Sequence, residues 1–226
     1  MRITLIDAGK RFNRDWIFRH LSYEFSAGHS YAITGSNGSG KSTLLQAVAS
    51  AINLSEGRID YSTTSAASAA STPTATTSLS PDQVYRQLAL CAPYLEVIEE
   101  MSATEFLTFH NGFKPFLPGL FIPDIIREVG LGSAADKQIR YYSSGMKQRV
   151  RLAQALFSNT PILLLDEPCT NLDADGITLY RRLTQQYGKD RLVIVSSNDR
   201  QEYDFCEKII NIMDYKGAVK NTGSVA

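Results

Sequence analysis

The sequence is poor in cysteine, with three such residues in 226, and none of them stands in a C-x-x-C motif. An odd, sparse set of this kind is typical of the reducing cytosol, and it excludes a disulfide-stabilised scaffold and a zinc knuckle. The three residues are Cys91, Cys169 and Cys206. The sequence therefore gives no reason to expect a structural metal.

Long apolar runs are lacking as well. The longest aliphatic runs, such as residues 162–165, are far shorter than the roughly 18 residues that a membrane-spanning helix needs. The first residues, M-R-I-T-L-I-D-A-G-K, contain no apolar stretch of the kind found in a signal peptide. We therefore expect a cytoplasmic protein without a membrane span of its own.

An excess of either charge is missing too. Lys and Arg number 23, as do Asp and Glu, so the net charge is zero. Nucleic-acid-binding domains usually carry a basic excess, so we expect no nucleic-acid partner. The composition is 43% hydrophobic and 20% charged, which is typical of a folded globular chain. The length suits one domain with room for a subdomain.

The residue pattern predicts an α/β fold. Alternating apolar residues predict strands within the first 34 positions, and residues 81–160 have mainly helical spacing. The runs I-L-L-L-D and L-V-I-V-S are apolar on both faces, as buried parallel strands are. A helix is predicted over 174–187 and a last strand near 209–213. Segment 62–80 is uncharged and rich in Ser, Thr and Ala. It shows neither helical nor strand periodicity, and we expect a flexible surface loop there.

Short motifs mark several helix ends. Ser102 and Glu105 have the spacing of a capping box, as do Ser80 and Gln83. Gly130 closes the segment P-D-I-I-R-E-V-G and is expected to terminate its helix.

A glycine-rich segment between a predicted strand and a predicted helix matches the pattern G-x-x-x-x-G-K-[ST]. Its glycines allow backbone N–H groups to turn inward around an anion, and the dipole of the following helix adds to the attraction. Lys41 is expected to reach the β- and γ-phosphates of a nucleotide, and the Ser42 hydroxyl to bind Mg²⁺. The predicted nucleotide-binding residues are Gly35, Ser36, Asn37, Gly38, Ser39, Gly40, Lys41, Ser42 and Thr43.

Two carboxylates follow the run I-L-L-L. A side chain at the carboxyl edge of a parallel strand faces the ligand crevice of an α/β fold. We expect Asp166 to hold Mg²⁺ through water, and Glu167 to orient the attacking water and accept its proton. Glu167 and Lys41 are therefore predicted catalytic residues.

With these motifs in this order, the sequence resembles the nucleotide-binding subunit of ATP-binding cassette (ABC) transporters. About 125 residues separate Lys41 from Asp166, as in that family, and the helical segment lies between them. The run Y-S-S-G-M-K-Q-R looks like a degenerate form of the family signature L-S-G-G-Q. The run D-E-P-C-T-N-L-D is similar to the family's Walker B strand and D-loop. The resemblance extends over residues 2–215.

The resemblance implies a P-loop NTPase fold with a RecA-like core, an N-terminal antiparallel β-subdomain and an inserted α-helical subdomain. Within a single domain of residues 1–226, it assigns 1–92 and 160–226 to the core with its β-subdomain. It assigns 93–159 to the helical subdomain that carries the signature. ATP and Mg²⁺ are the implied cofactors. An integral membrane permease is the implied partner, which would place the chain at the inner face of the cell membrane.

The signature stands at a predicted helix start, where hydroxyl and free N–H groups can bind an anion. In the family, two cassettes close head-to-tail around two ATP molecules, and the signature of one subunit contacts the ATP of the other. The resemblance therefore implies a homodimer in which Ser143, Ser144, Gly145 and Met146 face the partner's ATP. Asp173 falls at the position of the D-loop aspartate.

The family also stacks adenine on an aromatic ring near the N-terminus. Phe12 falls closest to that position, and Trp16 is a nearby alternative. Either ring offers the flat apolar face that stacking requires.

Two positions depart from the family pattern. The segment L-A-L-C-A-P-Y-L-E contains no glutamine where the family senses Mg²⁺ and the γ-phosphate, and Pro93 or a neighbour takes that place. Asn198 stands where the family has a histidine. An amide can hydrogen-bond a phosphate oxygen but cannot carry a charge. We therefore expect slow hydrolysis, with Asn198 as a third catalytic residue.

The leading hypothesis is an ATPase subunit that dimerises on ATP and powers transport through a separate permease. Two alternatives stay open: an ATP-dependent cassette protein that does not act in transport, and a weakly hydrolysing regulatory scaffold. Glu167, which the scaffold would not need, argues against the last. The signature resembles that of single-cassette exporters, which favours export over import.

Overall fold

The N-terminal part of the chain forms an antiparallel sheet. The computed structural model describes residues 1–64 and 76–216. Strands of this sheet lie in the order β2-β1-β4-β5. They are β1 (Arg2–Phe12), β2 (Asp15–Ser26), β4 (Glu56–Thr64) and β5 (Thr76–Leu79). The predicted alternation is confirmed in β2, where Leu21 and Phe25 are buried while Ser22 and Glu24 face solvent.

The loop predicted over 62–80 is wrong at both of its ends. Residues 62–64 extend β4, and residues 76–79 form β5, which pairs antiparallel with β4. Threonine is β-branched and favours the extended backbone, and the paired stretches contain several threonines. The ladder with β4 therefore outweighs the missing hydrophobic alternation. The rest of the predicted loop, 65–75, lies outside the described residues.

A second sheet is parallel, with its strands in the order β6-β7-β8-β3-β9. They are β6 (Leu88–Cys91), β7 (Ile162–Asp166), β8 (Leu192–Ser196), β3 (Ser30–Thr34) and β9 (Lys208–Asn211). Ser196 of β8 pairs with Ile33 of β3 on one side and with Asp166 of β7 on the other. The carboxyl ends of these three strands therefore meet at one edge. The last predicted strand is shorter than expected, because a 3₁₀ turn begins at residue 212.

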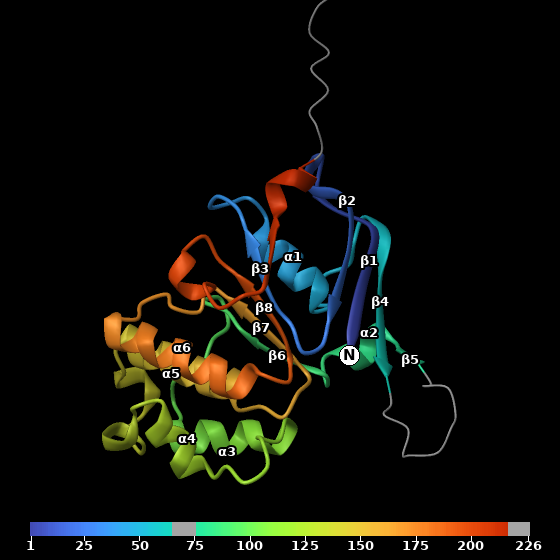
Figure 1. Cartoon of the computed structure of the whole chain (residues 1–226). Helices are drawn as coiled ribbons and strands as arrows, with labels where there is room; N and C mark the ends of the chain where they lie inside the picture. Colours follow the sequence, from blue (N-terminus) through green and yellow to red (C-terminus); the bar gives the residue numbers. More distant parts are fainter. Residues whose placement is uncertain (65–75, 217–226) are drawn as a thin grey trace, which may run out of the picture.

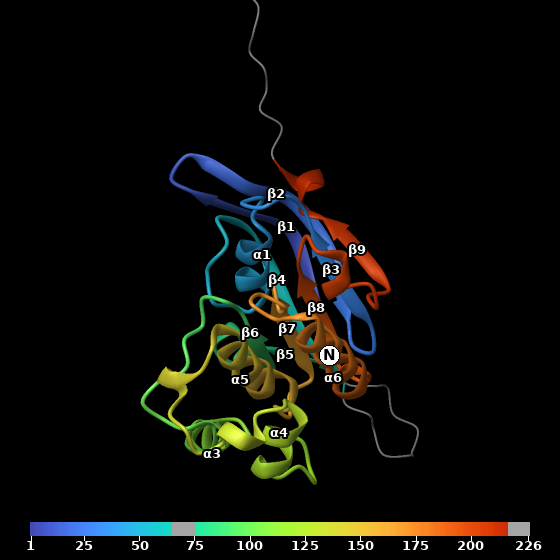
Figure 2. The same ribbon diagram turned by 90° about the vertical axis from the view of Figure 1, so that its left-hand side faces the viewer.

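Helices cover both faces of the parallel sheet. Figure 1 shows α1 on the side of the antiparallel sheet, α5 and α6 on the other side, and α3 with α4 forming the end farthest from the antiparallel strands. Figure 2 shows the same arrangement after a quarter turn. The α-helices are α1 (Lys41–Val48), α2 (Pro81–Val84), α3 (Ala103–Phe113), α4 (Ile122–Glu128), α5 (Ser144–Leu156) and α6 (Ala174–Gly188). The 3₁₀ turns are η1 (Gly132–Ala134), η2 (Ile139–Tyr141), η3 (Arg200–Glu202) and η4 (Ile212–Tyr215). Within the described residues, no helix has both the length and the apolar character needed to cross a membrane.

The helix ends follow the sequence motifs with one exception. The capping box at α3 is confirmed, since Ser102 Oγ accepts from the Glu105 N–H at 3.2 Å and the Glu105 carboxylate accepts from the Ser102 N–H at 2.8 Å. Gly130 has φ of 71° just after α4, as predicted for a helix terminator. The second predicted box is wrong, because the Ser80 side chain makes no capping bond to the described residues.

The central strands divide their side chains between two hydrophobic cores. In β7, Ile162 and Leu164 pack with the antiparallel sheet and α1, whereas Leu163 and Leu165 pack with the helices on the opposite face. β8 repeats this alternation. A strand that is buried on both faces has a fixed position, and it aims its terminal residues with little freedom.

Candidate active site

The loop after β3 adopts a backbone that requires glycine. Gly35 and Gly40 have φ of 148° and 104°, a region that other L-residues rarely adopt. A Cβ on Gly40 would stand 2.1 Å from Cγ2 of Ile17, and one on Gly35 would stand 2.7 Å from Oγ of Ser39. The loop is therefore held tightly between the antiparallel sheet and the start of α1. Ser42 and Thr43 follow in the first turn of α1.

Two polar side chains of this loop are buried. Lys41 is 4% exposed, and its Nζ donates to the carbonyls of Gly35 and Ser36 at 3.1 and 3.2 Å. Ser39 is 1% exposed, and its hydroxyl has no hydrogen-bond partner among the described residues. Among the described residues the Ser39 hydroxyl has no partner and the Lys41 ammonium group has no carboxylate beside it. Such a loop fits an anion.

Asp166 ends β7 at the same edge of the sheet. Its side chain is 1% exposed, and neither carboxylate oxygen accepts a hydrogen bond from the described residues. A buried carboxylate without donors is costly unless a cation is near. Hard oxygen ligands are those that Mg²⁺ prefers, so this unsatisfied carboxylate fits the predicted magnesium site.

Glu167 continues the chain in a strained conformation. Its φ is 42°, a left-handed value that is uncommon for residues other than glycine, and its N–H donates to the Ser196 carbonyl at 2.9 Å. The Thr170 hydroxyl donates to the Glu167 carbonyl at 2.8 Å, which closes the turn. Strain of this kind is kept only where the surroundings fix it, and the Glu167 side chain is half-buried in its surroundings.

Asn198 lies across the edge from the glycine-rich loop and contacts it directly. Its Nδ2 donates to Oδ1 of Asn37 at 2.8 Å. Both side chains are exposed. The structure thus brings together a position predicted from the loop after β8 and one predicted from the loop after β3.

Tyr94 lies next to the candidate site, although the sequence did not lead us to assign it a role there. It follows β6 by three residues and is 45% exposed. Burial, together with the nearby Asp166 carboxylate, raises the pKa of the Tyr94 hydroxyl to about 12. It directly follows Pro93, at the position where the expected glutamine is missing. A phenol in this place retains a hydrogen-bonding group that proline lacks. Its proximity to Asp166 depends on the pairing of β6 with β7, which no local pattern reveals.

The two aromatic candidates for stacking differ in their surroundings. Phe12 is 49% exposed at the end of β1, with Nζ of Lys10 at 4.9 Å from its ring centroid. Trp16 lies between two guanidinium groups, at 4.4 Å from Arg19 and 5.5 Å from Arg11. The Trp16 ring is therefore engaged by two cations. The Phe12 ring has one cation nearby and is the more accessible of the two for stacking.

The signature residues line a separate hollow of about 450 Å³. Ser143 is the N-cap of α5, and its hydroxyl accepts from the Met146 N–H at 3.2 Å. Ser144 and Gly145 open the helix beside it, as predicted. The hollow also takes in Asp173. None of its lining residues belongs to the glycine-rich loop, so within one chain the two predicted phosphate sites are distinct.

The turn before α6 is packed closely against the signature helix. A Cβ on Gly145 would stand 2.9 Å from the carbonyl oxygen of Asn171, so only glycine permits this approach. Asp173 is the N-cap of α6 and accepts from the Gly176 N–H at 2.8 Å. Arg149 reaches the same carboxylate at 3.5 Å. The predicted D-loop and signature are therefore one packed unit.

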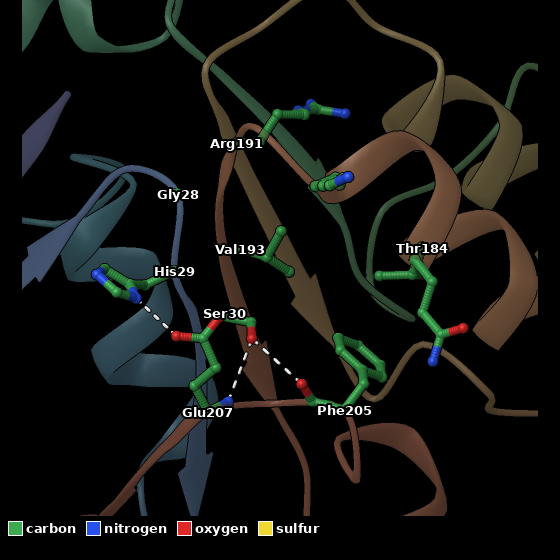
Figure 3. A pocket seen from close by; sticks show the side chains of 11 residues that line it. Gly28, His29, Ser30, Thr184, Arg191, Val193, Phe205 and Glu207 are labelled. Atoms are coloured by element: carbon green, nitrogen blue, oxygen red, sulfur yellow. Dashed lines mark hydrogen bonds and ion pairs between the residues drawn. The ribbon is translucent and has the colours of Figure 1, made fainter.

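Another hollow, of about 280 Å³, lies at the opposite edge of the parallel sheet (Figure 3). Ser30, Val193 and Glu207 line it near the amino ends of their strands, far from the loops described above. Its buried cation, Arg191, donates to the Leu156 carbonyl at 2.9 Å and to the Thr160 hydroxyl at 2.7 Å. Arg191 therefore links three segments of the fold through hydrogen bonds. We place the candidate active site at the carboxyl edge of the sheet instead.

Comparison of the sequence with known families gives one match over more than half of the chain. The family model described as ABC transporter matches residues 18–170. An ABC transporter ATP-binding protein of Bacillus subtilis, YybJ, is 28% identical over 207 residues, which cover 88% of this chain and 87% of that protein. The cytochrome c biogenesis ATP-binding export protein CcmA of Xylella fastidiosa is 32% identical over 163 residues, covering 72% of this chain and 68% of CcmA.

Solved structures give the same likeness. A putative ABC transporter ATP-binding protein from Pyrococcus furiosus superposes with a TM-score of 0.78 at 20% identity, covering 96% of this chain and all of that one. The cassette in a dimeric bacterial ABC transporter structure superposes with a TM-score of 0.71 at 22% identity, covering 92% of this chain and 93% of that one.

Proposed function

Because the chain belongs to the ABC transporter family and has the P-loop NTPase fold of its ATP-binding cassettes, we propose that it is the ATP-hydrolysing subunit of a transporter whose membrane permease is a separate chain. Four groups lie at the carboxyl edge of the parallel sheet, and this shared location is the observation that best supports the proposal. They are the buried Lys41, the unsatisfied Asp166 carboxylate, Glu167 in its strained turn, and Asn198 bonded to Asn37.

The residues after β3 would bind the nucleotide. Backbone N–H groups of residues 35–43 surround the phosphates, and Lys41 exchanges its two carbonyl partners for β- and γ-phosphate oxygens. The free Ser39 hydroxyl supplies one more donor. Phe12, with its exposed ring, stacks on the adenine.

Ser42 and Asp166 would hold Mg²⁺, the carboxylate through water. Mg²⁺ held there would supply positive charge to neutralise the phosphate oxygens. Glu167 orients the attacking water and accepts its proton, and its position depends on the N–H bond to the Ser196 carbonyl. Asn198 donates its amide to the γ-phosphate after giving up Asn37.

A second copy of the chain would complete each site. The signature hollow is lined by Ser143, Ser144 and Gly145 at the start of α5 but by no part of its own glycine-rich loop. An anion there is best supplied by the partner's ATP. The dimeric cassette among the structural relatives supports this arrangement. The Glu167→Gln variant with ATP and Mg²⁺ should sediment as a dimer, and a strictly monomeric species, alone and with its membrane partner, would contradict the proposal.

The permease would dock at the α3–β6 surface, by which we mean the exposed apolar side chains around the hollow between β6, α3 and α5. That hollow has a volume of about 220 Å³. Large exposed apolar residues cluster in α3, in the loop after β6 and in the turn between α2 and β6, where contact with water is unfavourable. They are Tyr85, Leu95, Ile98, Phe109 and Phe113. Docking there would keep the chain at the inner face of the cell membrane.

The direction of transport is not assigned by the relatives. CcmA carries an export name, whereas a relative from Staphylococcus aureus, HrtA, is named as a putative hemin import protein. The exporter-like signature keeps export as our proposal.

Steady-state ATP turnover by the full chain tests the catalytic part. General-base catalysis contributes roughly 10²–10⁴-fold, so Glu167→Gln should lose at least about 100-fold in kcat. Lys41→Ala should lose nucleotide binding. Glu207→Gln, at the opposite edge of the sheet, serves as the matched control and should stay within about twofold of the wild type. Equal turnover in the wild type and Glu167→Gln would overturn the proposal.

A weakly hydrolysing scaffold is the second candidate, and one observation favours it. Pro93 and Asn198 together remove both side chains with which the family senses the γ-phosphate. ATP-dependent dimerisation with turnover no faster than that of Glu167→Gln would support this candidate over the ATPase.

A further inference from the structure

Glu202 is a buried carboxylate that the proposed function leaves without a task. It ends η3, just after the loop that carries Asn198, and is 5% exposed. A hollow of about 280 Å³ beside it is lined by Glu167, Asn198 and Asp199 as well. Glu202 therefore lies directly beneath the residues that would carry out hydrolysis.

The carboxylate of Glu202 spans two loops that are distant in the sequence. Its Oε1 accepts from the Cys169 N–H at 2.7 Å. Cys169 stands two residues after Glu167, and its own carbonyl accepts from the Leu172 N–H at 2.9 Å. One acceptor thus fixes the middle of the turn that begins with Glu167 and leads to α6.

The backbone of Glu202 is itself held in place. The fully buried Tyr180 of α6 donates its hydroxyl to the Glu202 carbonyl at 2.8 Å. The Glu202 N–H donates to the Asp199 carbonyl at 3.1 Å. These two hydrogen bonds hold the Glu202 backbone in place, so the position of its side chain is fixed.

Stability alone does not explain a carboxyl group in this position. Its Oε2 has no hydrogen-bond partner among the described residues. Burial raises the pKa of Glu202, and the charges of Asp199 and Glu167 raise it further. A half-satisfied buried carboxyl is destabilising relative to an apolar side chain of similar size, so another requirement must retain it.

We propose that Glu202 is a positioning residue for ATP hydrolysis, which clamps the turn carrying Glu167 to the loop carrying Asn198. The inference rests on the proposed function. Through this clamp the carboxylate of Glu167 keeps its direction. Misplacing a reacting group by about 1 Å can cost on the order of 100-fold in rate, so the clamp matters to kcat.

Two substitutions at residue 202 separate positioning from charge. Glu202→Gln keeps an oxygen acceptor for the Cys169 N–H, whereas Glu202→Met keeps the approximate volume and removes the acceptor. We expect Glu202→Gln to keep kcat within about threefold, and Glu202→Met to lose roughly tenfold in kcat with the KM for ATP unchanged. Glu207→Gln is again the matched control, as an exposed carboxylate close in sequence.

Hydrogen–deuterium exchange of the full chain gives a readout that does not depend on turnover. Amides of residues 167–173 should exchange faster in Glu202→Met and at the wild-type rate in Glu202→Gln. Wild-type exchange in Glu202→Met would overturn the inference, as would a loss of kcat without a change in exchange.

Should Glu202→Met fail to fold, Tyr180→Phe tests the same clamp by removing a hydrogen bond to the Glu202 backbone. Removing the hydroxyl that donates to the Glu202 carbonyl should lower kcat several-fold and leave the KM for ATP unchanged. Unchanged kcat in folded Tyr180→Phe would then overturn the inference. A wild-type chain without turnover would instead refute the proposed function, while the exchange rates still decide whether Glu202 holds the turn.

Discussion

At the scale of single residues, Asn198 stands where the family resemblance led us to expect a histidine. Its amide donates to Oδ1 of Asn37. An asparagine can make the phosphate contact that we propose, but it adds no positive charge to the site.

Asn198→His should therefore raise kcat for ATP several-fold. An imidazole can donate to the γ-phosphate and, when protonated, stabilise the charge that develops on it. Steady-state turnover across pH 6 to 8 measures the effect, with Asn198→Ala as the control that loses the donor and slows. An unchanged rate in the histidine variant would mean that the site has adapted to asparagine.

The residues that could be predicted from sequence are those whose role is encoded locally. The glycine-rich loop and the Asp166–Glu167 pair have fixed spacings, and the structure places both at one edge of the sheet. Tyr94 and Glu202 could not be predicted, because their partners are supplied by strands and turns far away in the sequence. Whether each predicted residue performs its role stays a prediction.

At the scale of elements, helix caps show how far a local motif determines structure. Ser102 and Ser80 have the same spacing to an amide or carboxylate three residues on, yet only the Ser102 box forms among the described residues. α3 is long enough to benefit from a cap, whereas α2 is a single turn. The 62–80 segment is a similar case, because pairing with β4 decides its ends.

Ser102→Ala should destabilise the fold by about 1 kcal/mol, since N-cap removal costs roughly 0.5–2 kcal/mol. In a chain of this size that corresponds to a fall in Tm of about 2–4 °C. Ser80→Ala is the matched control and should leave Tm unchanged. Thermal unfolding followed by circular dichroism measures both, and equal shifts would contradict the structural difference between the two caps.

α3 also carries a pH-sensitive group. Burial, helped by Lys114, lowers the pKa of His110 to about 4, below its usual value of 6.5. Its Nε2 lies 2.9 Å from the Ser158 hydroxyl. The unfolded chain therefore binds a proton more readily than the folded chain between these values, and the stabilisation present above pH 6.5 is lost as pH falls towards 4.

Because the ring is only partly buried, we expect a loss of about 1 kcal/mol between pH 7 and pH 5 from this group. His110→Gln removes the titrating ring and should flatten this part of the stability profile. Urea unfolding at the two pH values measures the difference. A variant that loses as much stability as the wild type over this range would contradict the assignment to His110.

At the scale of the whole molecule, the α3–β6 surface is a region where exposed apolar side chains gather. Phe113 is 76% exposed and stacks edge-on against Phe109 at 4.9 Å. Such an exposed pair, beside a hollow, is more typical of a docking surface than of a free one.

Phe113→Ser should reduce co-purification with the membrane fraction by roughly tenfold without changing ATP turnover in solution. Ile209→Ser is the matched control, since Ile209 is 62% exposed on β9 at another part of the molecule. Equal membrane recovery for both variants would place the docking surface elsewhere.

The predicted α/β fold is confirmed as a whole, because the alternation of buried strands and helices is strong and the family motifs order it. The boundaries of the helical subdomain stay a prediction. These boundaries depend on whether α3, α4 and α5 move as one unit relative to the sheet, and amino-acid composition does not determine that.

The three cysteines offer a practical opportunity. Burial raises the pKa of the Cys91 and Cys206 thiols to about 12, and that of Cys169 also lies above its usual range. Since the thiolate is the reacting form, maleimide dyes at neutral pH should label the native thiols slowly, and the buried Cys91 and Cys169 least. One cysteine introduced at the exposed Ser133, on the rim of the signature hollow, would then carry a fluorophore in an otherwise wild-type background. Its emission would report the proposed closing of two subunits in real time.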